Sequence, residues 1–116
     1  MLKVYITNWG PHMNESLMQL EKEGYQLIKL TEGNVDIFGT DRLRYDIERQ
    51  FRETGITKDD FLLLSGSPVI GGISTALMML MTGRVNYMIY GAKLKDYTKR
   101  ENVIQYELPK QCRLKL

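Results

Sequence analysis

An unbroken apolar run at residues 61–64, Phe-Leu-Leu-Leu, constrains the fold of this chain more than any other feature. Polar residues bound it on both sides, at 59–60 and at 65–67. Because side chains alternate between the two faces of a strand, four consecutive apolar residues make both faces apolar. The pattern therefore predicts a strand that is covered on both faces. In one chain of 116 residues, this requires other elements packed on each face of a single sheet.

Segments with strand and helix periodicity alternate along the rest of the chain. Strands are predicted at residues 3–8, 25–30, 61–64, 85–90 and 103–108. Helices are predicted from an N-cap at Asn14 to Gly24, over about 41–54 behind an N-cap at Thr40, and from Pro68, behind Ser67 as N-cap, to a stop at Gly83. This order is typical of parallel strands joined by right-handed helical connections.

The predicted fold class is therefore α/β, a small Rossmann-like wound and mostly parallel sheet of about five strands with three helices. No helical pattern separates the strands at 85–90 and 103–108, so the last strand is predicted to pair antiparallel at an edge. An α+β arrangement is the alternative architecture.

Composition places the chain among ordinary globular proteins. Hydrophobic residues make up 43% and charged residues 26%, which excludes a disordered or collagen-like chain. We expect one domain over residues 1–116, with a basic and loosely held tail from about residue 109. No apolar run is long enough to span a bilayer, no leader is expected, and the single Cys112 excludes an internal disulfide. These features predict a protein of the reducing cytoplasm.

The formal net charge of +2 is too small to indicate nucleic acid as a partner. From Arg84 onward, however, eight bases stand against three acids, a local excess of +5. The first interpretation is a solvated face and tail, and the alternative is a wall that attracts an anionic ligand.

A binding site is predicted at the carboxyl ends of the parallel strands, where ligands of wound sheets bind. The loops that follow the first three strands supply the candidate ligand-binding residues Thr7, Asn8, Trp9, His12, Thr31, Glu32, Ser65, Gly66 and Ser67. The third loop is the most specific, because the helix after it begins without an acid and leaves its positive end for a foreign anion. The alternative is that Ser67 only caps the helix and Gly66 only makes the turn.

Motifs for catalysis are lacking. Gly66 and Gly71 have the glycine spacing of a phosphate loop, but Gly72 and Ile73 replace its lysine and hydroxyl residue. The dinucleotide fingerprint and the nucleophile elbow are also missing, and metal ligands are too few for a site. No catalytic residue, metal or cofactor is therefore assigned.

The helix predicted after residue 67 is apolar on nearly every side and carries Met78, Met79 and Met81. A sheet of this size covers only part of such a helix, so we expect a homodimer or a higher assembly that packs through it.

Four short stretches resemble small uncharacterised proteins encoded by bacteriophage genomes. They are V-Y-I-T-N at 4–8, L-T-E-G at 30–33, D-F-L-L-L-S-G at 60–66 and G-R-V-N-Y-M-I at 83–89. The resemblance implies a phage origin and a Rossmann-like fold, and it implies no particular reaction. Small phage proteins with nucleotide-sized pockets and no catalytic set look like anti-defence sponges, which hold the cyclic nucleotide or ADP-ribose signals of bacterial immune systems.

The expected function is therefore a non-catalytic one, sequestration of a phosphate-containing small molecule in the cytoplasm of an infected bacterial host. Two alternatives remain open at this point. One is an enzyme that acts on a nucleotide or ribosyl phosphate through His12, Glu32 or Asp41. The other is an inhibitor that binds a host protein through the methionine-rich or basic surface.

Overall fold

The computed structural model describes residues 1–10, 13–89 and 103–109. Along the chain the elements are β1 (Lys3–Ile6), α1 (Asn14–Lys22), β2 (Gln26–Lys29), α2 (Thr40–Thr54), β3 (Phe61–Leu63), α3 (Pro68–Thr82), β4 (Arg84–Met88) and β5 (Val103–Glu107). The predicted strands and helices are all present, with ends shifted by one or two residues. His12, Cys112 and the tail from residue 110 lie outside the described residues.

The strands form one five-stranded sheet in the order β2-β1-β3-β4-β5. β1 to β4 run parallel, and β5 pairs antiparallel with β4 from Arg84 opposite Glu107 to Met88 opposite Val103. The α/β prediction with an antiparallel edge strand is confirmed, and the α+β alternative is wrong. The order reverses between β1 and β3, so their carboxyl ends form the switch point of the sheet.

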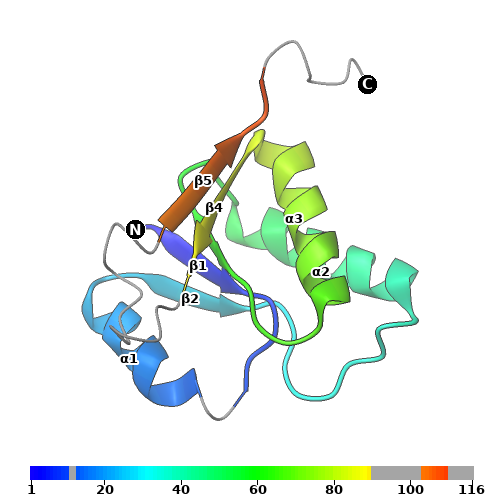
Figure 1. Ribbon diagram of the computed structural model, residues 1–116, viewed down its shortest axis with the longest axis horizontal. Coiled ribbons are helices and arrows are strands. Elements are labelled where there is room, and N and C mark those ends of the chain that lie inside the picture. The colour runs from blue at the N-terminus through cyan, green and yellow to red at the C-terminus, as the bar shows by residue number, and fades with distance from the viewer. Residues whose placement is uncertain (11–12, 90–102, 110–116) are drawn as a thin grey trace.

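The sheet has a hydrophobic core on each face, as the apolar run at 61–64 requires. α1 covers one face, and α2 with α3 covers the other (Figure 1). The core under α2 and α3 contains Tyr5, Leu30, Leu43, Ile47, Phe51, Leu62, Ile70, Leu77, Met78 and Val85. The core under α1 contains Val4, Ile6, Met13, Leu17, Leu20, Leu63 and Met88. Consecutive residues of β3, Leu62 and Leu63, belong to opposite cores because side chains alternate along a strand.

Both ends of α3 agree with the prediction from the sequence. Ser67 is the N-cap, its Oγ accepts a hydrogen bond from the Val69 N–H at 3.1 Å, and Pro68 is the first helical residue. Gly83 ends the helix with a φ of +79°, a conformation that favours glycine.

The predicted caps of the other two helices are wrong by one residue. Asn14 and Thr40 are the first residues of α1 and α2, and the cap positions belong to Met13 and Gly39, neither of which makes a side-chain capping bond. The Met13 N–H bonds to the Gly10 carbonyl at 3.0 Å, and the Met13 backbone has helical angles.

The amino ends of β1 and β3 are joined through a buried carboxylate. Asp60 is 1% exposed and pairs with the Lys3 Nζ at 3.1 Å, while its oxygens also accept the N–H groups of Lys3 and Thr57. A buried charge is tolerated when it is paired and hydrogen-bonded in this way. This cluster lies at the end of the sheet opposite the switch point and fixes the register of the two central strands.

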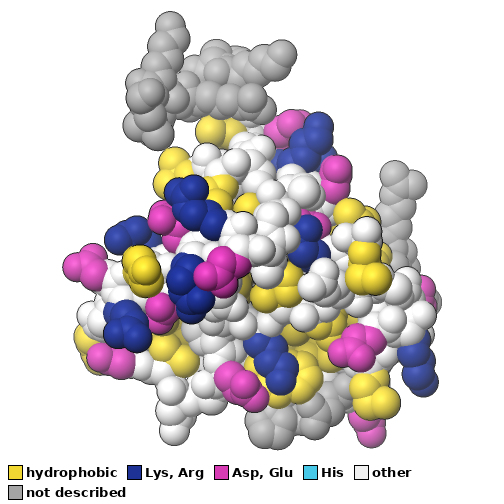
Figure 2. All heavy atoms as spheres, turned by 180° about the vertical axis from the view of Figure 1, so that it is seen from behind, with side chains coloured by type: hydrophobic (Ala, Val, Ile, Leu, Met, Phe, Trp, Pro, Cys, Tyr) yellow, Lys and Arg dark blue, Asp and Glu magenta, His cyan; other side chains and the backbone are white. Residues whose placement is uncertain are grey.

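Charges on the described surface are mixed in sign. Figure 2 shows basic and acidic side chains interspersed over one face, with no region of a single sign. On α2 they form pairs four residues apart, among them Arg42 with Asp46 at 3.2 Å. Of the basic residues from position 84 onward, Arg84 alone is described, and it pairs with Asp59 and Glu107 at 3.4 Å. No helix within the described ranges is long and apolar enough to cross a membrane.

Candidate functional site

An open groove of about 750 Å³ lies at the carboxyl end of β3, between the loop that enters α3, one flank of α3 and β4. Its lining residues come from three places in the chain that the parallel sheet brings together. They are Thr7, Leu64, Ser65, Gly66, Ser67, Pro68, Gly71, Gly72, Thr75, Ala76, Met79 and Tyr87.

The loop at 65–67 is held against the end of β1 by one hydroxyl. Thr7 is fully buried, and its Oγ1 donates to the Ser65 carbonyl oxygen at 2.6 Å and accepts from the Ser65 N–H at 2.7 Å. The Thr7 N–H also bonds to the Leu63 carbonyl at 3.1 Å. Because its hydroxyl is committed to the loop, Thr7 positions the groove and has little left to offer a ligand.

A glycine is required at position 66 because the loop at 65–67 passes close to Asn8. The Gly66 φ of +83° is one that residues with a side chain rarely adopt, and a Cβ placed there would lie 2.7 Å from the Asn8 Cβ. The glycine at this position is thus explained by the close contact with Asn8. The space over the missing side chain is filled by Asn8, and a ligand would have to approach from the groove side.

The start of α3 keeps part of its hydrogen-bonding capacity. Ser67 uses its Oγ for the Val69 N–H and its carbonyl for the Gly71 N–H at 3.2 Å. The N–H groups of Gly66 and Ser67, both at the groove, have no partner among the residues the structure describes. The first turn holds no acidic side chain, so the positive end of the helix is not neutralised locally.

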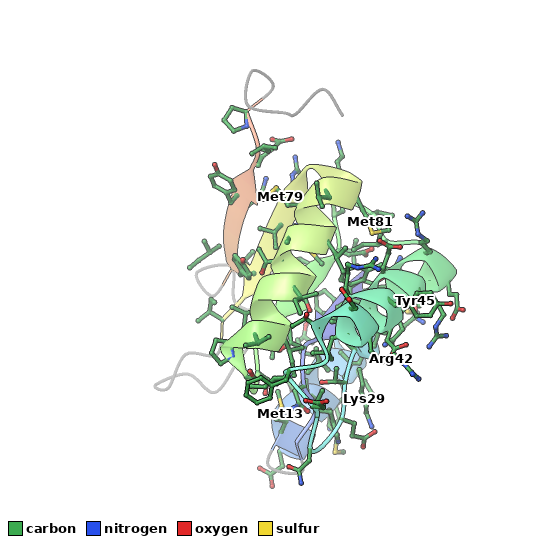
Figure 3. The ribbon with its side chains drawn as sticks, turned by 90° about the vertical axis from the view of Figure 1, so that its right-hand side faces the viewer. Met13, Lys29, Arg42, Tyr45, Met79 and Met81 are labelled. Atoms are coloured by element: carbon green, nitrogen blue, oxygen red, sulfur yellow. The ribbon has the colours of Figure 1, made fainter. Side chains whose placement is uncertain are left out.

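Away from the start of α3, the walls of the groove are mostly apolar. Leu64 is 47% exposed at one side, and Met79 lies on the strand side of α3, whereas Met81 lies toward α2 (Figure 3). This apolar part of the groove contains two hydroxyl groups, Thr75 Oγ1 and Tyr87 Oη, which lie 2.8 Å apart. One hydroxyl donates to the other, so the pair retains a donor and several acceptor lone pairs for a ligand.

Seven of the nine candidate residues predicted from the sequence fall into two groups, and Asn8 and His12 belong to neither. Thr7, Ser65, Gly66 and Ser67 line the groove. Asn8 touches Gly66 but gives its Nδ2 to the Gly33 carbonyl at 3.0 Å. His12 lies outside the described residues.

Trp9, Thr31 and Glu32 form a separate cluster over β2 and do not line the groove. The Trp9 N–H bonds to the Thr31 carbonyl at 2.9 Å, and the Lys29 Nζ lies 4.2 Å from the centre of the Trp9 ring. Glu32 is exposed and pairs with Lys29 at 3.7 Å, and the Thr31 Oγ1 donates to the Thr7 carbonyl at 2.7 Å. These residues join the loops after β1 and β2 to each other, and their role in ligand binding stays a prediction.

The sequence did not predict that one flank of α3 and the side chain of Tyr87 line the groove. The flank is made by the small residues Gly71, Gly72, Thr75 and Ala76, spaced three and four apart, which recede from the helix surface. The signal was present, because small residues at this spacing leave a hollow along an otherwise bulky apolar helix.

The groove lining contains one titratable side chain, Tyr87, among the residues that the structure describes. No cluster of histidine, cysteine, aspartate or glutamate suited to a metal ion occurs in the same part of the chain. Hydrogen-bond donors and apolar surface therefore dominate the chemistry of this site.

Comparison with known proteins adds no relative. No family model, no curated protein and no solved structure matches this chain.

Proposed function

We propose that this protein binds a phosphate-containing small molecule in the groove beside α3, without chemical conversion. The observation that carries the proposal is the pair of N–H groups at Gly66 and Ser67, two residues that line the groove, which have no partner among the described residues. Such N–H groups at an uncharged helix start suit an anion, with roughly 0.3–2 kcal/mol for each favourable contact.

The size and lining of the groove favour a ligand that has an apolar ring as well as a phosphate. A volume of about 750 Å³ falls within the roughly 300–1,000 Å³ typical of small-molecule sites. Thr75 lies seven residues after Pro68, about 10 Å along the helix at 1.5 Å per residue. A nucleotide with its phosphate at the loop would therefore place its sugar or base near the Thr75 and Tyr87 hydroxyls.

The positions of two candidate acids support binding over catalysis, while the third candidate of the enzyme alternative, His12, lies outside the described residues. Glu32 pairs with Lys29 over β2, and Asp41 is exposed in the first turn of α2. Neither lines the groove, and general acid or base work requires a group within hydrogen-bond distance of the reacting atom. The resemblance to small phage proteins supports a sponge that holds a cyclic nucleotide or an ADP-ribose derivative made by a bacterial immune system.

A thermal-shift screen with mono-, di- and cyclic nucleotides and with ADP-ribose tests the proposal. A ligand at 100 times its dissociation constant adds about 2.7 kcal/mol of stability, which raises the melting temperature by roughly 10 °C in a domain of this size. The protein loaded with that ligand is then denatured by heat. Recovery of intact ligand supports sequestration, recovery of a product supports an enzyme, and no shift with any compound contradicts the proposal.

Two tryptophan variants on the same helix provide a matched pair. Ala76→Trp fills the groove and should abolish the shift. Leu80→Trp replaces a side chain that is 64% exposed and outside the groove, so it should leave the shift unchanged.

A further inference from the structure

Among the described residues, β5 forms one edge of the sheet and has a strand neighbour on one side only. The Leu108 N–H bonds to the Gly83 carbonyl at 3.0 Å, and the register continues with Val85 opposite Tyr106. Because hydrogen-bonded and non-hydrogen-bonded pairs alternate in an antiparallel ladder, the N–H and carbonyl groups of Tyr106 point toward β4. Those of Val103 and Gln105 point outward, on the side where no described strand pairs with β5.

The side chains beside this edge are apolar on the face that carries α3. Ile104 and Tyr106 are opposite Tyr87 and Val85, so they share the face of the larger core, yet they are 57% and 53% exposed. β5 ends on one charged residue, Glu107, which pairs with Arg84, and Pro109 follows the strand, but residues 103–106 contain no charge and no proline. Proteins protect their edge strands with charges, prolines or covering elements, and this stretch carries neither a charge nor a proline.

We propose that a second copy of this chain pairs with β5 edge to edge, antiparallel, about a two-fold axis at Gln105. The two sheets then form one continuous sheet across the pair. Gln105 exchanges both backbone hydrogen bonds with Gln105 of the second copy. Ile104 lies opposite the second copy's Tyr106, and Tyr106 opposite its Ile104, so each exposed apolar side chain faces another on the same side of the sheet.

A second copy is the occupant that this edge fits best, because the arrangement is self-complementary. A two-fold axis always places the same surface on both partners, and here it matches the aliphatic residue to the aromatic one and the outward N–H to the outward carbonyl. The groove is not filled by this pairing, since Ile104 and Tyr106 do not line it.

The size of the contact sets its strength. Two half-exposed large side chains leave roughly 200 Å² to bury, and stable interfaces bury about 800 Å² on each partner. The five-residue strand edge adds to this area but does not reach that value. The dimer is therefore reversible and depends on protein concentration.

Sedimentation velocity over a series of protein concentrations tests the proposal on the full chain. The wild type should shift from monomer to dimer, and Ile104→Lys should remain a monomer. Met18→Lys is the matched control, because Met18 on α1 is also 57% exposed, and it should dimerise like the wild type. A wild type that remains monomeric at the highest concentration, or an Ile104→Lys variant that dimerises equally, overturns the proposal.

A cross-link tests the register and does not depend on the folding of the lysine variant. Gln105→Cys in a Cys112→Ser background should form a disulfide between copies, because hydrogen-bonded antiparallel pairs have Cα atoms about 5.5 Å apart, within disulfide range. Met18→Cys in the same background should not. A Gln105→Cys protein that gives no more cross-linked dimer than the Met18→Cys control contradicts the pairing.

Discussion

Replacing Thr7 by valine removes one hydroxyl and leaves the shape of the side chain almost unchanged. The Thr7 Oγ1 makes two hydrogen bonds, to the Ser65 carbonyl at 2.6 Å and from the Ser65 N–H at 2.7 Å. Each unsatisfied group costs about 1–3 kcal/mol when it is buried. Ser65 is partly exposed and water can reach it, so the lower end applies to both groups and the expected loss is about 2 kcal/mol.

Urea denaturation followed by circular dichroism measures this loss, and the melting temperature should fall by roughly 8 °C. Thr7→Ser keeps the hydroxyl and serves as the control, with a loss expected to be smaller than that of Thr7→Val. The valine variant should also bind nucleotides more weakly, because the loop that carries Gly66 and Ser67 loses its attachment to β1. A loss below about 0.5 kcal/mol would show that water replaces the hydroxyl and that Thr7 does not hold the loop.

Two further predictions concern single residues. Burial raises the pKa of Tyr5 to about 12, so the fold favours its neutral form. The contribution of Tyr5 to the free energy of unfolding should be constant below about pH 10 and should be lost as the pH rises from about 10 to 12. Tyr5→Phe should remove this part of the alkaline loss in urea denaturation across that range. Gly66→Ala should lower the free energy of unfolding by about 1–2 kcal/mol because of the positive φ alone, and by more because of the contact with Asn8. Gly72→Ala is the control, because Gly72 has open space at its Cβ and no positive φ, and it should be neutral or stabilising in the same urea assay.

The fold could be predicted because its strongest signals are local and redundant. The run at 61–64 demanded a strand covered on both faces, and Leu62 and Leu63 pack into opposite cores as that pattern requires. Ser67 and Gly83 marked the ends of α3 through capping and a left-handed turn, which depend on only a few neighbouring residues.

The candidate site was predicted less well, because it depends on which loops meet in space. The sequence indicated that all three loops follow parallel strands, but it did not show that Asn8 packs against Gly66 or that Trp9, Thr31 and Glu32 do not line the groove. Nor did it show that Tyr87, twenty residues after Ser67, faces the groove. These outcomes are set by side-chain packing between segments distant in the sequence, which periodicity does not report.

The central claim is that the groove accepts an anionic ligand at the start of α3, and the most direct test is a two-dimensional NMR titration of the ¹⁵N-labelled protein with adenosine monophosphate. The account predicts saturable shifts of the Gly66 and Ser67 amide signals, with smaller shifts along the groove at Thr75 and Ala76. Unchanged Gly66 and Ser67 signals at saturating nucleotide, or shifts confined to the cluster around Trp9, would contradict it.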